Sequence, residues 1–459
     1  GELHPRGSGS PGRIITLADY GSGPLPLIDA GKREAAIELS DQSYWEIRNI
    51  ETSGGDPYGI WITGNTPRAV VRDVYLKHVV VRDVAGTPAH TSTGLIVFNL
   101  QAKGERFEDI LVDGATAYNT TEWTGIYISG SPFTSPSGTK GENITVKNCT
   151  VHDVGGDGIV IHDTHHALIE HSVAYNTGLI KQSKLPTPNA IWNWDCDDCV
   201  VEYNEAYLTH TPGNRHDGAA YDSDYYNRNV TIQYNYAHDA DGYCVAVFGS
   251  GGKDSNVNTV IRYNICSNDG RNAYLSHQGD FFIHTWNGGS ILHARIYNNT
   301  SFWNPAASDP YAVKLDADLD PAQPDEFFNN IIYSTVPGFE DLDGPQTGTW
   351  RSNHNVFWYA GKGEPRWRKN GTSYSSLAAW HQTSGEDGRS VYADPRLRSP
   401  SYHERGRSRT AFTLLPGSPA AAAGWNTGDL GPRDFFGYPV PRTGAVSAGA
   451  AQPAPKGIK

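Results

Sequence analysis

Long apolar segments are missing from this chain of 459 residues, and no run of apolar residues could cross a membrane. Amphipathic helices of useful length are missing too, because the apolar residues alternate with period two instead of recurring every three or four positions. Basic residues are outnumbered, 37 against 50 acidic ones, which gives a net charge of −13. An acidic protein repels polyanions, so nucleic acid is not an expected partner. Membrane-spanning and helical classes are therefore excluded, and nucleic-acid binding is disfavoured.

Methionine is absent and cysteine is scarce, with five in the chain. Cys196 and Cys199 form a single CxxC pair, and the second pair that a zinc site usually needs is missing. We therefore expect the cysteines to be structural, with at least one of the five unpaired and no metal or cofactor bound. The chain begins at Gly1 without a signal peptide, so we expect the processed form of a secreted protein. Several Asn-X-Ser/Thr sequons are compatible with secretion.

Glycine (50 residues), proline (28) and asparagine are plentiful, as suits a chain that turns often. An apolar-x-x-Asn element recurs along the chain, and Ser172 and Cys149 occupy the place of the Asn in two units upstream. Successive Asn positions are separated by 31, 29, 35, 31 and 25 residues, as follows from their numbers: Asn204, Asn235, Asn264, Asn299, Asn330 and Asn355. A repeat of this length is typical of a solenoid, in which each unit buries its apolar face against its neighbours.

The repeat predicts an all-β fold, a right-handed parallel β-helix with a ladder of stacked Asn side chains. Short strand-like segments rich in Val, Ile, Tyr and Phe fill each unit. Stacked Asn amides can hydrogen-bond along the column, which satisfies polar groups that would be costly to bury. We expect residues 1–35 to form an N-terminal cap or first coil, 36–340 the β-helix, 341–410 an insertion or cover, 411–450 a closing end cap, and 451–459 a disordered tail.

The stacked Gly-Ile-x-Ile and Ile-x-Tyr-Asn segments resemble the pectin-lyase-like superfamily of carbohydrate-active β-helices. Ala393-Asp-Pro, Leu415-Pro-Gly-Ser-Pro and Asp434-Phe-Phe-Gly resemble the closing segments of its secreted bacterial members. The resemblance covers about three quarters of the chain and implies the fold. It does not settle the activity, because lyases, hydrolases, epimerases and non-catalytic adhesins share this scaffold.

Aligning the coils predicts which side chains face outward, because side chains alternate along a strand. Ile159, Ile191, Ala219, Ile161, Asn193 and Tyr221 should point inward. The outward columns should then hold Val160, Trp192, Ala220 and Cys244, and beside them His162, Trp194, Asp222 and Ala246.

Asp224 should continue outward from Asp222 on the same strand, at a Cα distance of about 6.5–7 Å. Two carboxyl groups this close raise one pKa, which leaves an acid beside a carboxylate, as glycoside hydrolysis requires. We therefore expect Asp222 and Asp224 to be catalytic. The alternatives are a solvated Asp pair and a calcium site.

Asp217 aligns with Asp157 and Asp241, each before a strand glycine, which favours a role in the turn. The segment from His216 to Asp224 nevertheless resembles the Asp-bearing coil of lacto-N-biosidase-like β-helix hydrolases. That resemblance implies an acid and a nucleophile at Asp217 and Asp224.

Aromatic side chains are predicted around these aspartates, where they could stack on sugars. Trp192 and Trp194 lie one coil before the Asp pair, and Tyr225 and Tyr226 follow it; packing beneath the segments 176–188 or 345–390 is the alternative. A surface His162 could donate to a hydroxyl, and Trp286 with His284 could form the far wall of a groove. Asp195 and His216 complete the predicted binding residues, with a simple turn the alternative for Asp195.

These features predict a secreted, monomeric glycoside hydrolase that acts on a neutral or weakly charged oligo- or polysaccharide. A polysaccharide lyase or uronate epimerase is the first alternative; it would need calcium on the Asp cluster, or Arg215, His216, Lys253 or Arg271, to neutralise a uronate. The second alternative is a glycan-binding β-helix without catalysis.

Overall fold

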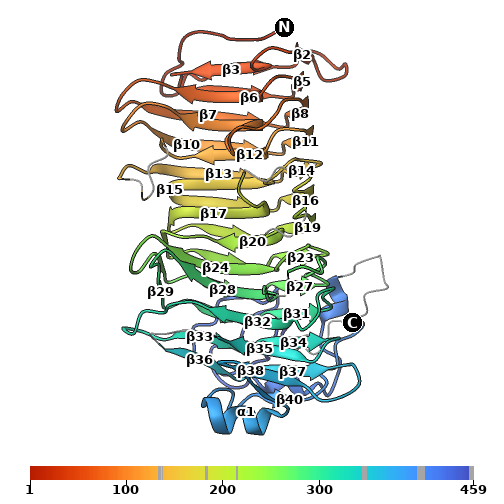
Figure 1. Cartoon of the computed structure of the whole chain (residues 1–459). Coiled ribbons are helices and arrows are strands. Elements are labelled where there is room, and N and C mark those ends of the chain that lie inside the picture. The colour runs from red at the N-terminus through yellow and green to blue at the C-terminus, as the bar shows by residue number, and fades with distance from the viewer. Residues whose placement is uncertain are drawn as a thin grey trace. The chain divides into compact units, whose positions relative to one another are not determined.

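The computed structural model describes residues 1–132, 136, 138–180, 185–212, 216–275, 277–343, 349–400 and 409–453. These residues divide into two compact units, one of residues 1–218 with 226–228 and one of residues 219–225 with 229–459. Each unit is a stack of coils in which successive strands pair in parallel (Figure 1). The fold is the right-handed parallel β-helix that the repeat predicted, and the first unit is described first.

Each coil of the first unit contributes strands to three faces. The first face consists of β3 (Ile37–Ser40), β6 (Tyr58–Gly64), β9 (Gly94–Leu100), β12 (Thr124–Ser129), the first half of β15 (Ile159–Glu170) and β17 (Asn189–Asp197). The second consists of β1 (Ile15–Ala18), β4 (Trp45–Arg48), β7 (Val70–Lys77), β10 (Arg106–Asp113), β13 (Gly141–Lys147), the second half of β15 and β18 (Val200–Glu202). The third consists of β2 (Leu27–Gly31), β5 (Glu51–Gly54), β8 (Val80–Val84), β11 (Thr116–Thr120), β14 (Thr150–His152), β16 (Val173–Thr177) and β19 (Glu205–Thr209), and β21 (Asn227–Arg228) pairs with β17.

The second unit repeats this arrangement. Its first face consists of β20 (Ala219–Ser223), β24 (Val245–Ser250), β28 (Phe281–Trp286), β32 (Tyr311–Asp316), β35 (Gly338–Leu342) and β38 (Arg366–Lys369). Its second consists of β22 (Thr231–Gln233), β26 (Val260–Arg262), β30 (Arg295–Tyr297), β33 (Asp325–Phe328) and β36 (Trp350–Asn353), with a short pair β25 (Asn256–Val257) and β29 (Ile291–Leu292). Its third consists of β23 (Tyr236–His238), β27 (Ile265–Ser267), β31 (Thr300–Trp303), β34 (Ile331–Ser334), β37 (Val356–Tyr359) and β40 (Val391–Tyr392).

The Asn ladder is present at the turn between two faces. In the second unit the backbone N–H of Asn235 donates to Asn264 Oδ1, that of Asn264 to Asn299 and that of Asn299 to Asn330, each at 2.9 Å. The residue before each ladder position has a left-handed backbone, for example Tyr263 with φ of 53°. In the first unit Ser172 N donates to Asn204 Oδ1 (2.9 Å) and Cys149 N to Ser172 Oγ (3.1 Å), so these residues occupy the predicted ladder positions.

The β-helix extends beyond residue 340, which corrects the expected boundary. Strands β36, β37 and β40 add parallel pairs up to Tyr392, so much of the predicted insertion at 341–410 is further coil. Among the described residues of this range, β39 (Thr372–Tyr374), which pairs antiparallel with β38, and α1 (Leu377–Ser384) depart from the pattern. Residues 401–408 and 454–459 lie outside the described residues.

The predicted closing segment, 411–450, lies along the side of the second unit's coils and so is not an end cap. It begins within the short helix η1 (Arg409–Phe412) and contains η2 (Pro419–Ala422). Its backbone accepts hydrogen bonds from Asn298 Nδ2 at Ser447 O (2.8 Å) and Gly449 O (3.1 Å). Its apolar side chains join the outward side chains of β23, β27, β34 and β37 in one core cluster.

At least one of the five cysteines is unpaired, as expected. Cys244 and Cys266 form a disulfide in the second unit, and Cys149, Cys196 and Cys199 are reduced and buried. Cys244 was expected to face outward; its bond to Cys266 corrects that prediction, and the chain is irregular here because both Cys244 N and Val245 N donate to Asp280 O. Across the described residues, no helix is both long and apolar enough to span a membrane.

Candidate active site

The first face of the first unit has the predicted register. Val160 pairs with Trp192 and His162 with Trp194, and Ile159 and Ile191 are fully buried. The Val160 column continues upstream through Tyr127, Val97 and Trp61. This outward face is thus lined with rings, and Trp192 and Trp194 belong to it as expected.

Trp192 and Trp194 are half-buried among neighbours in their own unit. Trp192 packs against the cluster of Val97, Tyr127 and Val160, and its ring centroid lies 6.3 Å from that of Trp194. Both indoles therefore keep part of their surface accessible while their orientation is fixed by packing, which suits stacking on a sugar ring.

His162 is not a surface residue, which corrects that expectation. Its side chain is 1% exposed, and its ring lies edge-on between Tyr127 (4.9 Å) and Trp194 (5.0 Å). Nδ1 lies 2.6 Å from Asp163 Oδ2, and Nε2 has no hydrogen-bond partner within the described part of the chain. Its role is consistent with positioning Trp194.

Asp217 is half-buried in the first unit, in a left-handed turn with φ of 60°, and Thr187 Oγ1 donates to its carboxylate. Asp157 lies nearby and is 3% exposed. Burial is the main cause that raises the pKa of Asp157 to about 7, and the charge of Asp217 acts in the same direction. Hydrogen bonds from Asn189 N and Trp123 Nε1 lower the pKa but do not offset the burial. Asp217 therefore has a protonatable carboxyl group beside it.

Asp195 is an internal ion-pair residue. It is 2% exposed, and its Oδ1 lies 2.9 Å from Lys140 Nζ, which also pairs with Asp197 at 2.9 Å. Contact with substrate is therefore not supported for Asp195.

His216 is exposed, and its carbonyl accepts a hydrogen bond from Thr211 Oγ1 (2.8 Å). Tyr226 is half-buried, with φ of 63°.

In the second unit, Asp222 faces outward as the alternation predicted but is not exposed. It is in register with Ala246 and Phe282 and is 1% exposed. Tyr243 Oη lies 3.5 Å from its Oδ2. Tyr221 and Ser223 point inward, where Ser223 Oγ lies 3.0 Å from Thr259 Oγ1. The prediction of an exposed carboxylate at 222 is therefore wrong.

Asp224 lies just beyond the strand, because β20 ends at Ser223. It is half-buried; its Oδ1 accepts a hydrogen bond from Tyr225 N (2.9 Å), and its carbonyl accepts one from Asn256 Nδ2 (3.1 Å). Tyr225 contacts the edge of Trp286 at 5.7 Å, and Trp286 stacks on His284 at 5.7 Å. The predicted far wall of Trp286 and His284 is thus beside Tyr225.

The cations proposed for a lyase already have partners where the structure describes them. Lys253 Nζ lies 2.8 Å from Asp320 Oδ2, and Arg271 donates to Asn304 O at 2.5 Å. Arg215 lies outside the described residues. Lys140 and Tyr243 could not be foreseen from the sequence, because their partners, Asp195 and Asp222, are 55 and 21 positions away along the chain. Asp157 was expected only as a turn residue. It lies in the glycine-rich segment before β15, and no local pattern shows that Trp123 and Trp192 enclose it.

Fold and register together define a right-handed parallel β-helix. The chain belongs to the family described as the right handed beta helix region, whose model matches residues 30–183 and 124–301.

The chain is also similar to two proteins that are described as lacto-N-biosidases. A lacto-N-biosidase of Bifidobacterium longum subsp. longum is 25% identical over an alignment of 510 residues that covers 91% of this chain and 30% of that protein. The chain thus spans about a third of the length of that curated relative. Crystal structures of a GH136 lacto-N-biosidase from Eubacterium ramulus are 18% identical, with TM-scores of 0.53 and 0.52; each alignment covers 69% of this chain and 59% or 60% of that one.

Proposed function

We propose that this protein is a glycoside hydrolase whose acid and base, or acid and nucleophile, come from the aspartates of the 217–224 segment. One carboxyl group protonates the glycosidic oxygen as its bond to the anomeric carbon breaks. Another carboxylate takes a proton from the attacking water or bonds to the anomeric carbon itself. The observation that carries the proposal is the similarity to a lacto-N-biosidase over 91% of the chain.

The accessible carboxyl groups in this segment are those of Asp217 and Asp224, each half-buried. We assign the reacting roles to these two residues. Asp222 is 1% exposed against Tyr243, so we give it a positioning role. Half-buried aromatic rings accompany both assignments, Trp192 in the unit of Asp217 and Tyr225 with Trp286 in the unit of Asp224.

A neutral or weakly charged glycan is the proposed substrate. The net charge of −13 disfavours polyanionic polymers, and Lys253 and Arg271 are engaged by Asp320 and Asn304.

We also propose that the protein works outside the cell as a monomer, because the Cys244–Cys266 disulfide suits an oxidising compartment and the solenoid's sheets need no partner chain.

Single Asn variants test the assignment. D217N and D224N should each lower kcat on a cleaved oligosaccharide by roughly 10²–10⁴-fold, the usual contribution of general acid–base catalysis. D222N should cost less. Initial rates on a panel of neutral oligosaccharides, with product analysis and with or without chelator, provide the measurement. Azide should restore turnover if the changed residue is the base or nucleophile.

Asp429→Asn is the matched control, because Asp429 is an exposed carboxylate elsewhere in the second unit. It should keep full activity, and all variants should keep the wild-type Tm within about 2 °C, the shift that corresponds to roughly 0.5–1 kcal/mol. Near-wild-type rates in both D217N and D224N would sink the assignment. A product that absorbs near 235 nm and depends on calcium would point to a lyase instead.

A further inference from the structure

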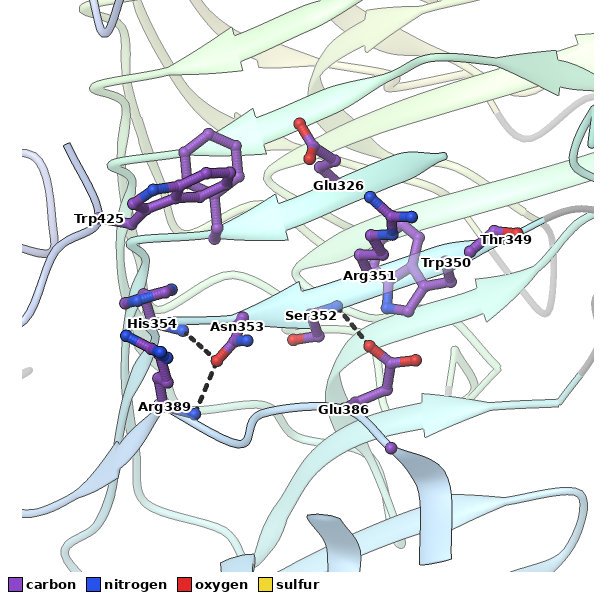
Figure 2. Close-up of a pocket in the computed structure, with 12 residues that line it drawn as sticks. Glu326, Thr349, Trp350, Arg351, Ser352, Asn353, His354, Glu386, Arg389 and Trp425 are labelled. Carbon is purple, nitrogen blue, oxygen red and sulfur yellow. Dashed lines mark hydrogen bonds between the residues drawn. The ribbon is translucent and has the colours of Figure 1, made fainter. Parts of the chain in front are cut away.

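A hollow lies in the second unit, on the outward side of β33 and β36 (Figure 2). Its volume is about 660 Å³, within the range of small-molecule sites. It shares no residue with the 217–224 segment. The lining residues come from β33, β36, the turn after α1 and the closing segment: Glu326, Phe328, Thr349, Trp350, Arg351, Ser352, Asn353, His354, Gly385, Glu386, Arg389 and Trp425.

One wall of this hollow is an exposed but rigidly held indole. Trp425 is 45% exposed, and its backbone is fixed on both sides by Asn329, which accepts from Trp425 N (2.7 Å) and donates to Trp425 O (2.9 Å). Its ring stacks on His354 at 5.8 Å and meets Phe328 edge-on at 5.6 Å. A solvent-exposed aromatic ring with a fixed orientation is the kind of surface on which the C–H face of a pyranose ring stacks.

Polar groups around the hollow offer both donors and acceptors. Asn353 Oδ1 accepts from His354 N (3.0 Å) and Arg389 N (2.8 Å), so its NH₂ group is left without a protein partner in the described part of the chain. Glu386 accepts from Ser352 N at 2.7 Å (Figure 2). Trp350 is 6% exposed, and its ring stacks on the buried Phe327 at 6.1 Å, so the indole packs into the coil behind the hollow.

Both acidic and basic side chains line the hollow. Glu326 and Glu386 are accompanied by Arg351 and Arg389. Arg295 Nε lies 3.0 Å from Glu326, and burial raises the pKa of Glu386 to about 7, so this group can both donate and accept a hydrogen bond. A cleft that offers donors and acceptors beside one aromatic wall suits the hydroxyl groups of a sugar.

We propose that this hollow is an ancillary carbohydrate-binding site, which holds one neutral pyranose unit stacked on Trp425 and hydrogen-bonded by Asn353 and Glu386. It goes beyond the proposed hydrolase activity and does not depend on it. Its function is to retain the protein on a glycan.

Ligand-observed NMR with the full chain tests the site. The probes are the methyl glycosides of galactose, N-acetylglucosamine and glucuronic acid, each titrated against wild type, W425A, W425F and D224N. We expect at least one neutral glycoside to bind wild type and D224N equally. Binding should weaken at least 10-fold in W425A and less in W425F, while W425A should keep the wild-type kcat on a short soluble oligosaccharide.

Tyr20→Ala is the control for loss of an exposed aromatic ring, because Tyr20 is fully exposed in the first unit; its binding should equal that of wild type. Thermal unfolding checks that W425A and W425F fold. The site is refuted if no neutral glycoside binds, if only the glucuronide binds, or if folded W425A and W425F bind as wild type does. Binding lost in D224N but kept in W425A would place the sugar at the candidate active site and also overturn the proposal.

Discussion

Asp325 has a carboxyl group that is wholly enclosed in the second unit. Its Oδ1 accepts from Ala294 N at 2.6 Å, and Oδ2 has no protein partner in the described part of the chain. Burial raises its pKa to about 8, and the charges of Asp320 and Glu326 add to the effect. The folded protein therefore keeps a proton that the unfolded chain releases near pH 4.

Asp325→Asn should change how stability depends on pH. Because the folded state binds the extra proton between about pH 4 and 8, the free energy of unfolding of the wild type falls as pH rises through this window. The variant is neutral throughout and loses this fall. Its Tm should match the wild type near pH 5 and exceed it at pH 9, by roughly 2–4 °C per kcal/mol recovered.

Thermal unfolding from pH 5 to 9 measures the difference between the two curves, and D429N should follow the wild type. An identical pH dependence in D325N would show that Asp325 is ionised in the folded state. Other buried carboxyl groups, such as Asp157 and Asp280, still shape both curves, since burial raises the pKa of each to about 7.

Side-chain direction could be predicted from the sequence where the strands are regular, though not at Cys244, whereas burial could not be predicted. The alternation of strand side chains correctly placed Trp192, Trp194 and Asp222 outward. Whether an outward side chain meets water depends on neighbours that come from other parts of the chain. Tyr243 covers Asp222, and Lys140 pairs with Asp195. No local sequence pattern indicates such contacts. The sequence therefore predicted candidate site residues but not their burial or their partners.

At the scale of elements, the Asn ladder fixes the turn between two faces. Asn299 is fully buried; its Nδ2 donates to Ile261 O (3.0 Å), Tyr297 O (3.1 Å) and Asn330 Oδ1 (3.1 Å). Its Oδ1 accepts from the backbone and side chain of Asn264 at 2.9 and 3.0 Å. Each coil thus completes the hydrogen bonds of the next.

Asn299→Ala should destabilise the second unit by about 3–5 kcal/mol, since it leaves several buried groups unsatisfied at about 1–3 kcal/mol each, with partial relaxation. Asn426→Ala is the control: the Asn426 side chain makes three hydrogen bonds, donating to Pro441 O and Gly444 O and accepting from Gly428 N, but at a solvent-accessible position where water can replace them. Denaturant unfolding should show a loss at Asn426 of roughly 1 kcal/mol or less. Equal losses at both positions would contradict a special role for the ladder.

The ladder could be predicted because its spacing is written directly in the sequence. The coils that follow were harder to foresee. Asn355 continues the ladder, and its backbone N–H donates to Ser390 Oγ (2.9 Å), so a serine replaces the Asn of the next coil. The excursion through β39 and α1 between these positions breaks the strand pattern. The Asn repeat therefore stops being recognisable in the sequence before the last strands of the β-helix in the structure.

At the scale of the molecule, the closing segment lies along an apolar column on the outside of the second unit. Tyr236, Ile265, Ile331 and Val356 face outward there and pack with Phe412, Ala420, Ala448 and Ala450. Polar bonds hold the same segment, including Ala450 N to Thr300 Oγ1 (2.8 Å) and Tyr234 Oη to Arg433 O (3.1 Å). The outward apolar residues of this column, interrupted at Thr300, are a sequence pattern that could have indicated a covering segment in place of the end cap that was expected.

A chain that ends at residue 410 should therefore lose stability in the second unit alone. Without residues 411–453 the apolar column becomes exposed to water, at a cost of roughly 25 cal/mol for each Å² uncovered. Because coils of a solenoid interact chiefly with their neighbours, the first unit should be little affected. Hydrogen exchange read by mass spectrometry should rise at least 10-fold in β23, β27, β31 and β34 and stay unchanged in β5, β8, β11 and β14. Adding a peptide of residues 411–453 should restore protection, and faster exchange in both units alike would mean that the closing segment stabilises the whole chain instead.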